Sequence, residues 1–384
     1  TLGILTNSIL VWSQYLTEKF VQQRLPESAR PWQLARIYLL NAGVVLVLLG
    51  QLLIQAWVQH WILTQVGATF VAATVAWHGA VLFGQWRHAE AKRFRPVVAA
   101  YVAAAFFLAV GAVLGALLAV HPGQPRLLIA HVAANVGGFV GLAAAGSLTI
   151  LFPSIWRTKG INPYMRLSFA LLGLGVIGAL VGAAWNVPQA GLILYCAGWV
   201  LSLHGWVGNA LTVLRDPRGR ITYPALSVLC SAFWLVGALT YYAVQHFFNA
   251  EPKIPMLALV IGFAAQLLTG VMAYLLPSTM GGGPGAVRAG LREFNRWGLG
   301  RAVFINGGLG LWLATSNSLV MVAASLLCIG SMAVLPILIV RGVKAQKAVL
   351  QKKAQGPAPV TTTNWDQAWV ALAVLIVLGG LGLL

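Results

Sequence analysis

Long apolar runs follow one another along almost the whole chain, and this feature most constrains how the chain can fold. An α-helix needs about 20 apolar residues to cross the hydrocarbon of a bilayer. Runs of this kind cover residues 36–58, 61–85, 96–121, 127–153, 164–186, 188–214, 223–247, 254–277, 300–316, 318–341 and 366–384, after a shorter run over 1–14. With 59% apolar and only 8% charged residues, the composition is also far from that of a soluble protein. We therefore expect an all-α, polytopic membrane bundle of about twelve helices, forming one integral membrane domain over residues 1–384.

The basic residues predict how these helices are oriented, because cytoplasmic loops retain Lys and Arg. Alternate loops carry Lys19, Arg24, Arg30 and Arg36; Arg87, Lys92, Arg93 and Arg95; Arg157, Lys159 and Arg166; Arg215, Arg218 and Arg220; Arg288, Arg292, Arg296 and Arg301; and Arg341, Lys344, Lys347, Lys352 and Lys353. The other set of loops holds only Arg126 and Lys253. The sequence thus predicts a multi-pass protein of the cell membrane with both ends of this chain extracytoplasmic. The net charge of +18 then reflects topology and contact with anionic lipids, and no nucleic-acid partner is expected.

The ends of the chain carry two further expectations. It begins at Thr1 without a methionine, and its first run is too short to span, so we expect the natural protein to extend upstream. Any copper domain of the whole protein would follow Leu384, on the expected outer side.

An internal repeat is visible at an offset of 124 residues. The stretch AHVAANVGGFVGLAAAGSLTILFPS, residues 130–154, resembles PMLALVIGFAAQLLTGVMAYLLPS, and Pro153 corresponds to Pro277. A His-Gly pair at His78 recurs at His204, with an offset of 126. These matches predict parallel four-helix repeats over 36–154 and 164–278, with a faint third copy over 300–384 in which Cys328 to Ser331 replaces the pair.

The acidic residues are informative because they avoid the centres of the apolar runs. All of them fall in loops or near run ends: Glu18, Glu27, Glu90, Asp216, Glu251, Glu293 and Asp366. Ion-coupled carriers and pumps usually keep a carboxylate inside the membrane. The absence of a carboxylate from the centres of the apolar runs argues against such a carrier and against a proton-pumping oxidase.

Histidine is the remaining side chain with chemical potential inside the apolar runs. His131 is expected about one turn, roughly 6 Å, below the outer surface, and Asn135 follows one turn later. One interpretation is packing, in which His131 donates to a neighbouring carbonyl and Asn135 bonds across helices. The alternative is that His131 binds the iron of a haem, whose flat ring would lie against the glycines at 137, 138, 141 and 146.

His78 and His204 are the other two histidines expected within the membrane. They occupy equivalent repeat positions, so they could meet inside the bundle and contribute to a cofactor site. A packing role satisfied by hydrogen bonds is the alternative for both.

These motifs carry a resemblance to known proteins. The order His131, Gly138, Gly146 and Pro153 is similar to the second helix of heme-copper oxidase subunit I, and the four-helix repeat is similar to that superfamily's threefold plan. Together with LVWSQYLTEKF, AWHGAVLF and GFAAQLLTGVMAYLLPSTMGGGPGAVR, residues 130–160 more closely resemble the membrane region of actinobacterial copper-containing nitrite reductases and related multicopper oxidases. The resemblance implies a heme-copper-oxidase-like bundle that holds haem b through His131.

The chain also departs from these families. Pro255 stands at the repeat position of His131, and no outer loop has the Cys, His and Met ligands of a cupredoxin. The chain therefore has no complete catalytic site, and copper is expected only in a domain or partner outside it. The leading hypothesis is an oxidoreductase component that relays electrons, with quinol as an expected donor, to a cupredoxin domain or redox protein on the outer side. The alternatives are a solute or metal permease and a non-catalytic membrane anchor.

A glycine-rich stretch, MGGGPGAVRAGLREFNRWGLGR, lacks the Lys-Ser/Thr ending of a phosphate-binding loop. We expect an amphipathic segment at the lipid headgroups, with Arg288, Arg292 and Arg296 on one face.

Overall fold

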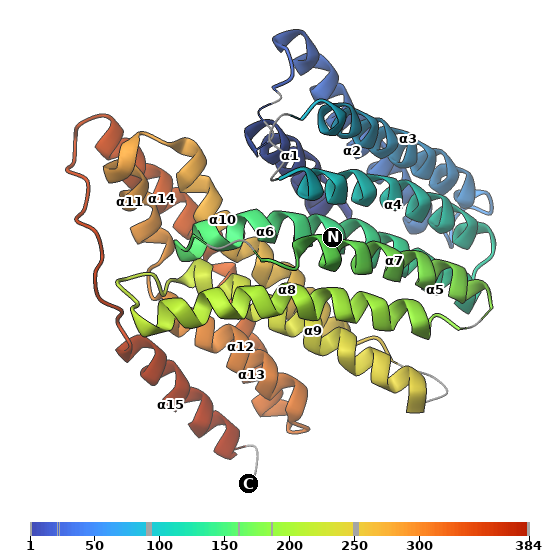
Figure 1. Cartoon of the computed structure of the whole chain (residues 1–384). Helices are drawn as coiled ribbons and strands as arrows, with labels where there is room; N and C mark the ends of the chain where they lie inside the picture. The colour runs from blue at the N-terminus through green and yellow to red at the C-terminus, as the bar shows by residue number, and fades with distance from the viewer. Residues whose placement is uncertain are drawn as a thin grey trace. The chain divides into compact units, whose positions relative to one another are not determined.

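The computed structural model of the chain describes residues 2–20, 22, 24–89, 94–159, 162–185, 187–248 and 253–381. Glu90, Lys92, Arg93, Glu251 and both terminal residues lie outside this range. The described part is helical and contains no strand, as expected (Figure 1). Its elements are α1 (Leu2–Phe20), η1 (Glu27–Ala29), α2 (Arg30–Leu52), α3 (His60–Arg87), α4 (Arg95–Val120), α5 (Pro125–Val132), η3 (Ala133–Gly141), α6 (Leu142–Trp156), α7 (Met165–Ala184), α8 (Gln189–Arg215), α9 (Tyr223–Phe248), η4 (Ala258–Ala265), α10 (Gln266–Met280), α11 (Gly283–Phe294), α12 (Gly298–Ala314), α13 (Ser318–Ala333), α14 (Leu335–Leu350) and α15 (Asp366–Leu381).

The chain divides into two compact units, the first made of Thr1–Leu151 and Ile161–Ser202. In this unit α2, α3 and α4 pack side by side, and α5, η3 and α7 pack next to them (Figure 1). Glycine allows the closest approach: a side chain at Gly67 would collide with the backbone of α2 at Gly43. Small residues at such crossings are typical of helices packed in membranes.

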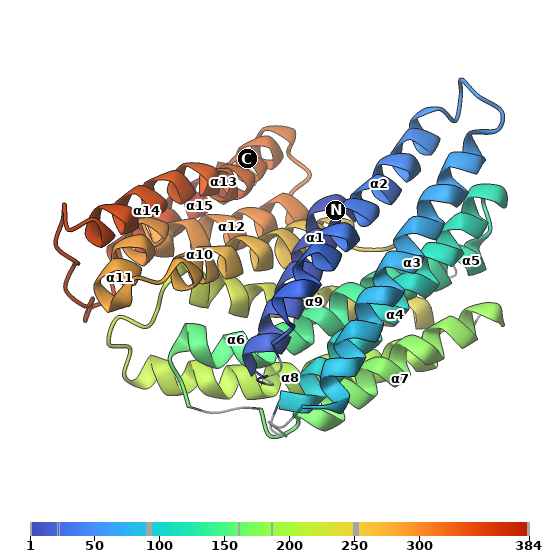
Figure 2. The same ribbon diagram turned by 90° about the horizontal axis from the view of Figure 1, so that it is seen from above.

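The second unit consists of Phe152–Gly160 and Leu203–Leu384. Here α9 packs on η4 and α10, α12 packs on α13 and α15, and α11 packs on α14 (Figure 2). Its core is formed by buried side chains from these helices: Tyr223, Ala273, Phe294, Ile305, Leu309, Cys328, Met332 and Leu338.

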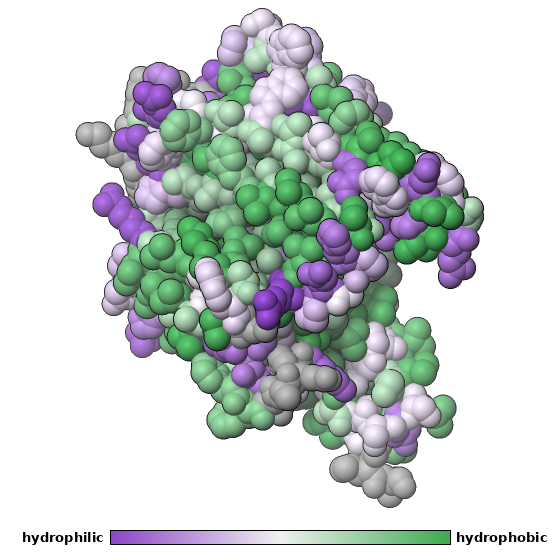
Figure 3. Space-filling view, turned by 90° about the vertical axis from the view of Figure 1, so that its right-hand side faces the viewer, coloured by the Kyte–Doolittle hydropathy of each residue, from purple (hydrophilic) through white to green (hydrophobic). Residues whose placement is uncertain are grey.

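Nine helices of the described part are long and apolar enough to cross a membrane. They are Glu27–Leu52, His60–Arg87, Arg95–Val120, Pro125–Trp156, Met165–Ala184, Gln189–Arg215, Tyr223–Phe248, Ala258–Met280 and Ser318–Leu350. Large apolar side chains are widely exposed on the surface, and many of them gather on the face in Figure 3. Such a surface fits a lipid environment, so the chain is a multi-pass membrane protein.

The remaining predicted segments also lie on helices. The run over 300–316 corresponds to α12, with 17 residues, and the run over 366–384 corresponds to α15, with 16 described residues. The first run was expected to end at residue 14, but α1 continues to Phe20. It can do so because the polar side chains of Ser13 and Gln14 are buried and hydrogen-bonded inside the first unit. Twelve membrane crossings stay a prediction.

Matching local structures occur at the expected repeat offset. At both places a π-helix, η3 or η4, leads into an α-helix that contains a proline, Pro153 in α6 and Pro277 in α10. In the first, Gly138 lies against Phe107, and in the second, Gly262 lies against Trp234. These features favour the repeat, although its extent over 36–154 and 164–278 stays a prediction.

Several basic residues that we assigned to loops lie on helices. Arg36 is on α2 and Arg301 is on α12, and they are only 4% and 5% exposed. Their guanidinium groups find hydrogen-bond acceptors within the protein, on His78 for Arg36 and on the carbonyl of Phe294 for Arg301. The sequence-based boundaries placed both helix starts too late.

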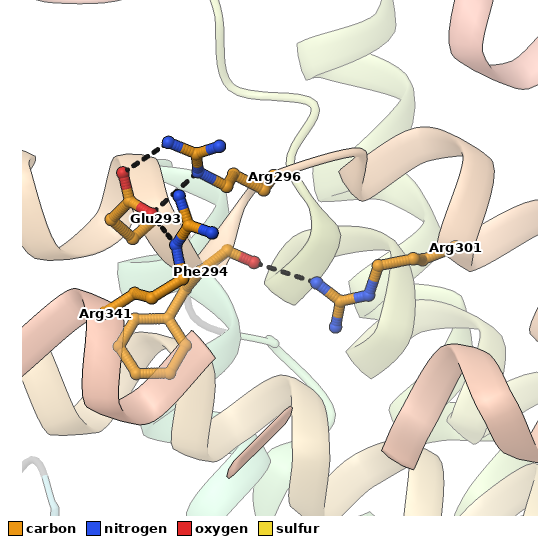
Figure 4. A network of polar contacts seen from close by, with 5 residues as sticks. All are labelled: Glu293, Phe294, Arg296, Arg301 and Arg341. Carbon is orange, nitrogen blue, oxygen red and sulfur yellow. Dashed lines mark hydrogen bonds and ion pairs between the residues drawn. The ribbon is translucent and has the colours of Figure 1, made fainter. Parts of the chain in front are cut away.

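The glycine-rich stretch forms the amphipathic helix α11, but the predicted arginine face is wrong in one respect. The helix ends at Phe294, so Arg296 lies beyond it and instead pairs with Glu293, as does Arg341 from α14 (Figure 4). Arg301 donates to the Phe294 carbonyl at the same helix end, where a cation also complements the helix dipole (Figure 4).

Candidate functional site

His131 lies at the end of α5, where the chain packs closely against α4. Its Nδ1 is 2.9 Å from the carbonyl oxygen of Gly111. Gly115, one turn further along α4, faces the ring so closely that an added side-chain carbon would lie 2.7 Å from Cε1. Two glycines on α4 thus make room for the imidazole and bring a backbone carbonyl within its reach.

The bond to Gly111 fixes which nitrogen of His131 carries the proton. A carbonyl oxygen can only accept, so Nδ1 must donate. In the neutral ring Nε2 then carries a lone pair, and its nearest donor, Asn135 Nδ2, is 3.5 Å away. The Asn135 amide makes its shorter bond, 2.8 Å, to the backbone carbonyl of His131. Metal-binding histidines typically have this arrangement, in which one N–H is held by a carbonyl and the other nitrogen is a ligand.

The glycines that follow His131 are not an open face in this structure. Phe107 of α4 covers Gly138, and Tyr101 of the same helix covers Gly146. Tyr195 of α8 covers Gly141 and donates its hydroxyl to the carbonyl of Gly137. Aromatic rings of the protein therefore occupy the place where we expected a planar ligand to lie.

The π-helix η3 begins two residues after His131. Such segments often occur at functional sites. However, η4 has the same form in the second unit, where Pro255 takes the position of His131. The π-helical turn therefore does not itself require a histidine.

His78 lies on α3 and is only 4% exposed. Its Nε2 is 2.9 Å from the hydroxyl oxygen of Ser13 on α1, and its Nδ1 is 3.1 Å from an Nη of Arg36 on α2. The guanidinium also lies 5.7 Å from the ring centre of Trp77. One imidazole thus connects three helices of the first unit.

The protons in this cluster can be assigned from the partners. Because a guanidinium has no acceptor, Arg36 donates to Nδ1, and the neutral imidazole donates from Nε2 to Ser13. The Ser13 hydroxyl then donates to the carbonyl of Leu10, 3.2 Å away. Both ring nitrogens are in use, so His78 could bind a cofactor only by giving up Ser13 or Arg36.

Arg36 is the member of this cluster that sequence analysis missed. We placed it in a cytoplasmic loop because it stands at the edge of an apolar run. The available signal was its proximity to that run, since a charge at a run's edge can lie on either side of the helix start. Only the contact with His78, 42 residues away, decides the matter.

His204 lies on an exposed position of α8 in the second unit, whereas His78 is buried in the first. The two histidines therefore have different environments despite their equivalent places in the predicted repeat. Their expected meeting stays a prediction.

The remaining described histidines are at helix ends. His60 and His88 each contact a glycine carbonyl of the adjacent turn or helix, Gly50 and Gly84 respectively. Within the described residues, His, Cys, Asp and Glu form no group of three or more that could hold a metal ion.

No protein-family model, curated protein or solved structure matches this chain.

Proposed function

We propose that this chain is the membrane domain of a protein like the actinobacterial copper-containing nitrite reductases and multicopper oxidases. In this proposal it holds b-type haem through His131 and relays electrons to a cupredoxin domain or redox protein on the extracytoplasmic side. The observation that carries the proposal is the hydrogen bond from His131 Nδ1 to the Gly111 carbonyl, which leaves Nε2 with the lone pair that a haem iron needs.

His131 Nε2 is suited to bind a haem iron, but the helix that follows His131 leaves no room for the haem ring. A bound haem would supply a one-electron couple. Phe107, Tyr101 and Tyr195 fill the space over the glycines, so the ring could not lie there without their movement. A second axial ligand is not among the described contacts of His131.

Copper belongs, in this proposal, outside the chain. Blue-copper sites, which transfer electrons, bind the metal through two His, one Cys and a weak axial ligand such as Met. Cys196, Cys230 and Cys328 all lie on the helices α8, α9 and α13, not in loops. The partner that receives electrons would supply its own copper ligands.

The test is the absorbance spectrum of the full chain, purified after expression with ample haem precursor. We expect a Soret band that His131→Gly abolishes and that added imidazole restores, because free imidazole can replace the missing ligand. His88→Ala is the matched control, since this exposed histidine also bonds a glycine carbonyl at the end of a helix, but that helix is α3. Its spectrum should match that of the unmodified protein.

A haem-free spectrum of the well-folded chain would contradict the proposal, and so would a Soret band that survives in His131→Gly without imidazole. Circular dichroism of each variant shows whether the helical fold is intact. The two readouts together separate loss of a ligand from loss of structure.

A membrane anchor is the second candidate function, and the filled glycine face favours it. If Phe107, Tyr101 and Tyr195 serve only to pack α4 and α8 onto η3 and α6, His131 is a packing residue that bonds Gly111. The anchor predicts that His131→Leu changes the stability of the purified chain and leaves its visible spectrum unchanged.

A further inference from the structure

The second unit contains a cavity of about 840 Å³ between α9, α12 and the segment that leads into η4. Trp234 and Tyr241 line it from α9, Pro255 and Met256 from the segment before η4, and Asn306 from α12. Several lining side chains, including Tyr241 at 56% and Met256 at 59%, are also exposed on the protein surface. The cavity therefore opens to the surroundings of the helices, which in a membrane protein include the lipid.

The corresponding place in the first unit is filled. There His131 and Asn135 project from α5 and η3 onto Gly111 and Gly115 of α4. In the second unit Pro255 stands at the sequence position that corresponds to His131, and its side chain, which cannot form hydrogen bonds, lines the cavity.

The lining restricts the charge of an occupant. Among the described residues that line the cavity there is no Lys, Arg, His, Asp or Glu. A phosphate or carboxylate would lose its water here without gaining a counter-charge, which is strongly unfavourable. The occupant is therefore uncharged, which argues against a phospholipid headgroup or a fatty-acid carboxylate.

The lining also favours a ring over a simple hydrocarbon chain. Phe233, Trp234 and Tyr241 present aromatic rings, which stack on other flat rings. Asn306 supplies the polar contact. Its Oδ1 accepts from Trp234 Nε1 at 2.9 Å and its Nδ2 donates to the carbonyl of Ala302 at 2.7 Å.

Those two bonds use only part of the Asn306 amide. The oxygen has a second lone pair and the nitrogen a second hydrogen. The amide can therefore donate to a quinone carbonyl or accept from a quinol hydroxyl, and so it suits both redox states of one ring. A saturated acyl chain would use neither group.

We propose that this cavity binds the ring of an uncharged membrane quinone or quinol, held between the aromatic side chains of α9 and the amide of Asn306. This inference goes beyond the proposed function, because it names a membrane quinol as the class of molecule that would donate the electrons. Binding itself needs no haem, so the failure of one proposal is distinguishable from the failure of the other.

The experiment uses the full chain in phosphatidylcholine nanodiscs and an azidoquinone photolabel. We expect labelled peptides from α9 and from the segment leading into η4, and at least tenfold less labelling when decylubiquinone is added in excess. Gly237→Phe should also reduce labelling at least tenfold, because Gly237 lines the cavity and an added side-chain carbon there meets no described atom within 4 Å. The new ring would fill the site without a clash at its first carbon.

Gly208→Phe is the matched control. Gly208 lies on α8, has the same open space around it and does not line the cavity, so labelling should be unchanged. Asn306→Leu should weaken labelling severalfold, because it removes the amide and keeps an apolar side chain. Labelling that persists in Gly237→Phe, or that added lipid displaces as well as decylubiquinone does, would overturn the proposal.

Discussion

At the scale of single residues, the histidines of this chain illustrate how a buried ring acquires its protonation from its neighbours. His131 donates from Nδ1 because Gly111 offers a carbonyl, and His78 accepts at Nδ1 because Arg36 offers only N–H groups. The two rings are therefore opposite tautomers. The chemistry open to each differs accordingly, since His131 Nε2 has only a long contact of 3.5 Å with Asn135, whereas both nitrogens of His78 have partners at 3.1 Å or less.

The cluster around His78 leads to a stability prediction for Ser13. Ser13→Ala removes the acceptor for His78 Nε2 and leaves that N–H unpaired in a buried site. We expect the free energy of unfolding to fall by about 1 kcal/mol or somewhat more. The measurement is reversible unfolding in mixed micelles, followed by circular dichroism.

Thr17 on the same helix provides the matched control. Its buried hydroxyl has no hydrogen-bond partner among the described residues. Thr17→Val therefore removes an unsatisfied group and should leave stability unchanged or raise it slightly. If Ser13→Ala and Thr17→Val lowered the free energy of unfolding equally, the Ser13 hydrogen bond would not stabilise the unit.

At the scale of elements, helices of the first unit approach one another through glycine. A side chain at Gly67 would meet backbone atoms of α2, and one at Gly191 would meet backbone atoms of α7. Backbone atoms cannot move aside without shifting the whole helix. The α2–α3 and α7–α8 pairs are therefore held at their separations by the absence of these two side chains.

This packing predicts the effect of Gly67→Leu. The leucine would have to force α2 and α3 apart, which in a well-packed core costs about 1–3 kcal/mol or more. Gly173→Leu, at a glycine of α7 with open space around it, should cost little. Thermal unfolding of both variants in the same detergent tests the difference, and similar melting temperatures would refute the close approach.

Another element, α11, is joined to α14 through a carboxylate. Glu293 accepts from Arg296 at 2.7 Å and from Arg341 at 3.0 Å, and its side chain is 16% exposed. Hydrogen bonds from Arg296, reinforced by those from Arg341, hold the pKa of this carboxyl below its ordinary value, although burial acts in the opposite direction. The carboxyl therefore binds its proton more weakly in the folded state than in the unfolded state.

The resulting pH dependence has a definite sign. The contribution of Glu293 to stability is fully present above its unfolded pKa and is lost as the pH falls through the lower, folded pKa. Because both arginines are largely exposed, we expect an effect of only about 0.5 kcal/mol. Comparing unfolding at pH 7 with unfolding near pH 3 should show a smaller loss for Glu293→Gln than for the unmodified chain.

The control for that comparison is Glu27→Gln, at an exposed position of η1. It should follow the pH dependence of the unmodified chain. If Glu293→Gln also follows it, the carboxylate does not couple α11 to α14 in solution.

At the scale of the whole molecule, the distribution of positive charge determines the expected orientation in the membrane. A reporter inserted near Lys352 should be active only in the cytoplasm, and one inserted at Gly123 only on the outer side, because basic loops are retained inside. Gly123 lies in the turn between α4 and α5, and Lys352 lies just after α14. The reverse pattern would overturn the expected orientation and, with it, the proposal of an extracytoplasmic redox partner.

The class of protein and most of its helices could be predicted from the amino-acid sequence. Apolar length is a local property, so each long run could be identified without knowing its neighbours, and the nine candidate spans agree with those runs. The burial of Arg36 and Arg301 was missed for a related reason. A charged residue at the edge of a run is kept inside a helix only when a distant partner, such as His78, satisfies it.

The surroundings of each candidate residue became visible only in the folded chain. Glycines after His131 read as open space in the sequence, but rings from α4 and α8 fill that space, since helices in a membrane pack wherever small residues let them approach. In the second unit Pro255, at the sequence position that corresponds to His131, lines a cavity. Whether a small residue makes a binding site or a packing contact depends on the facing helix, and a sequence read along one helix does not contain that information.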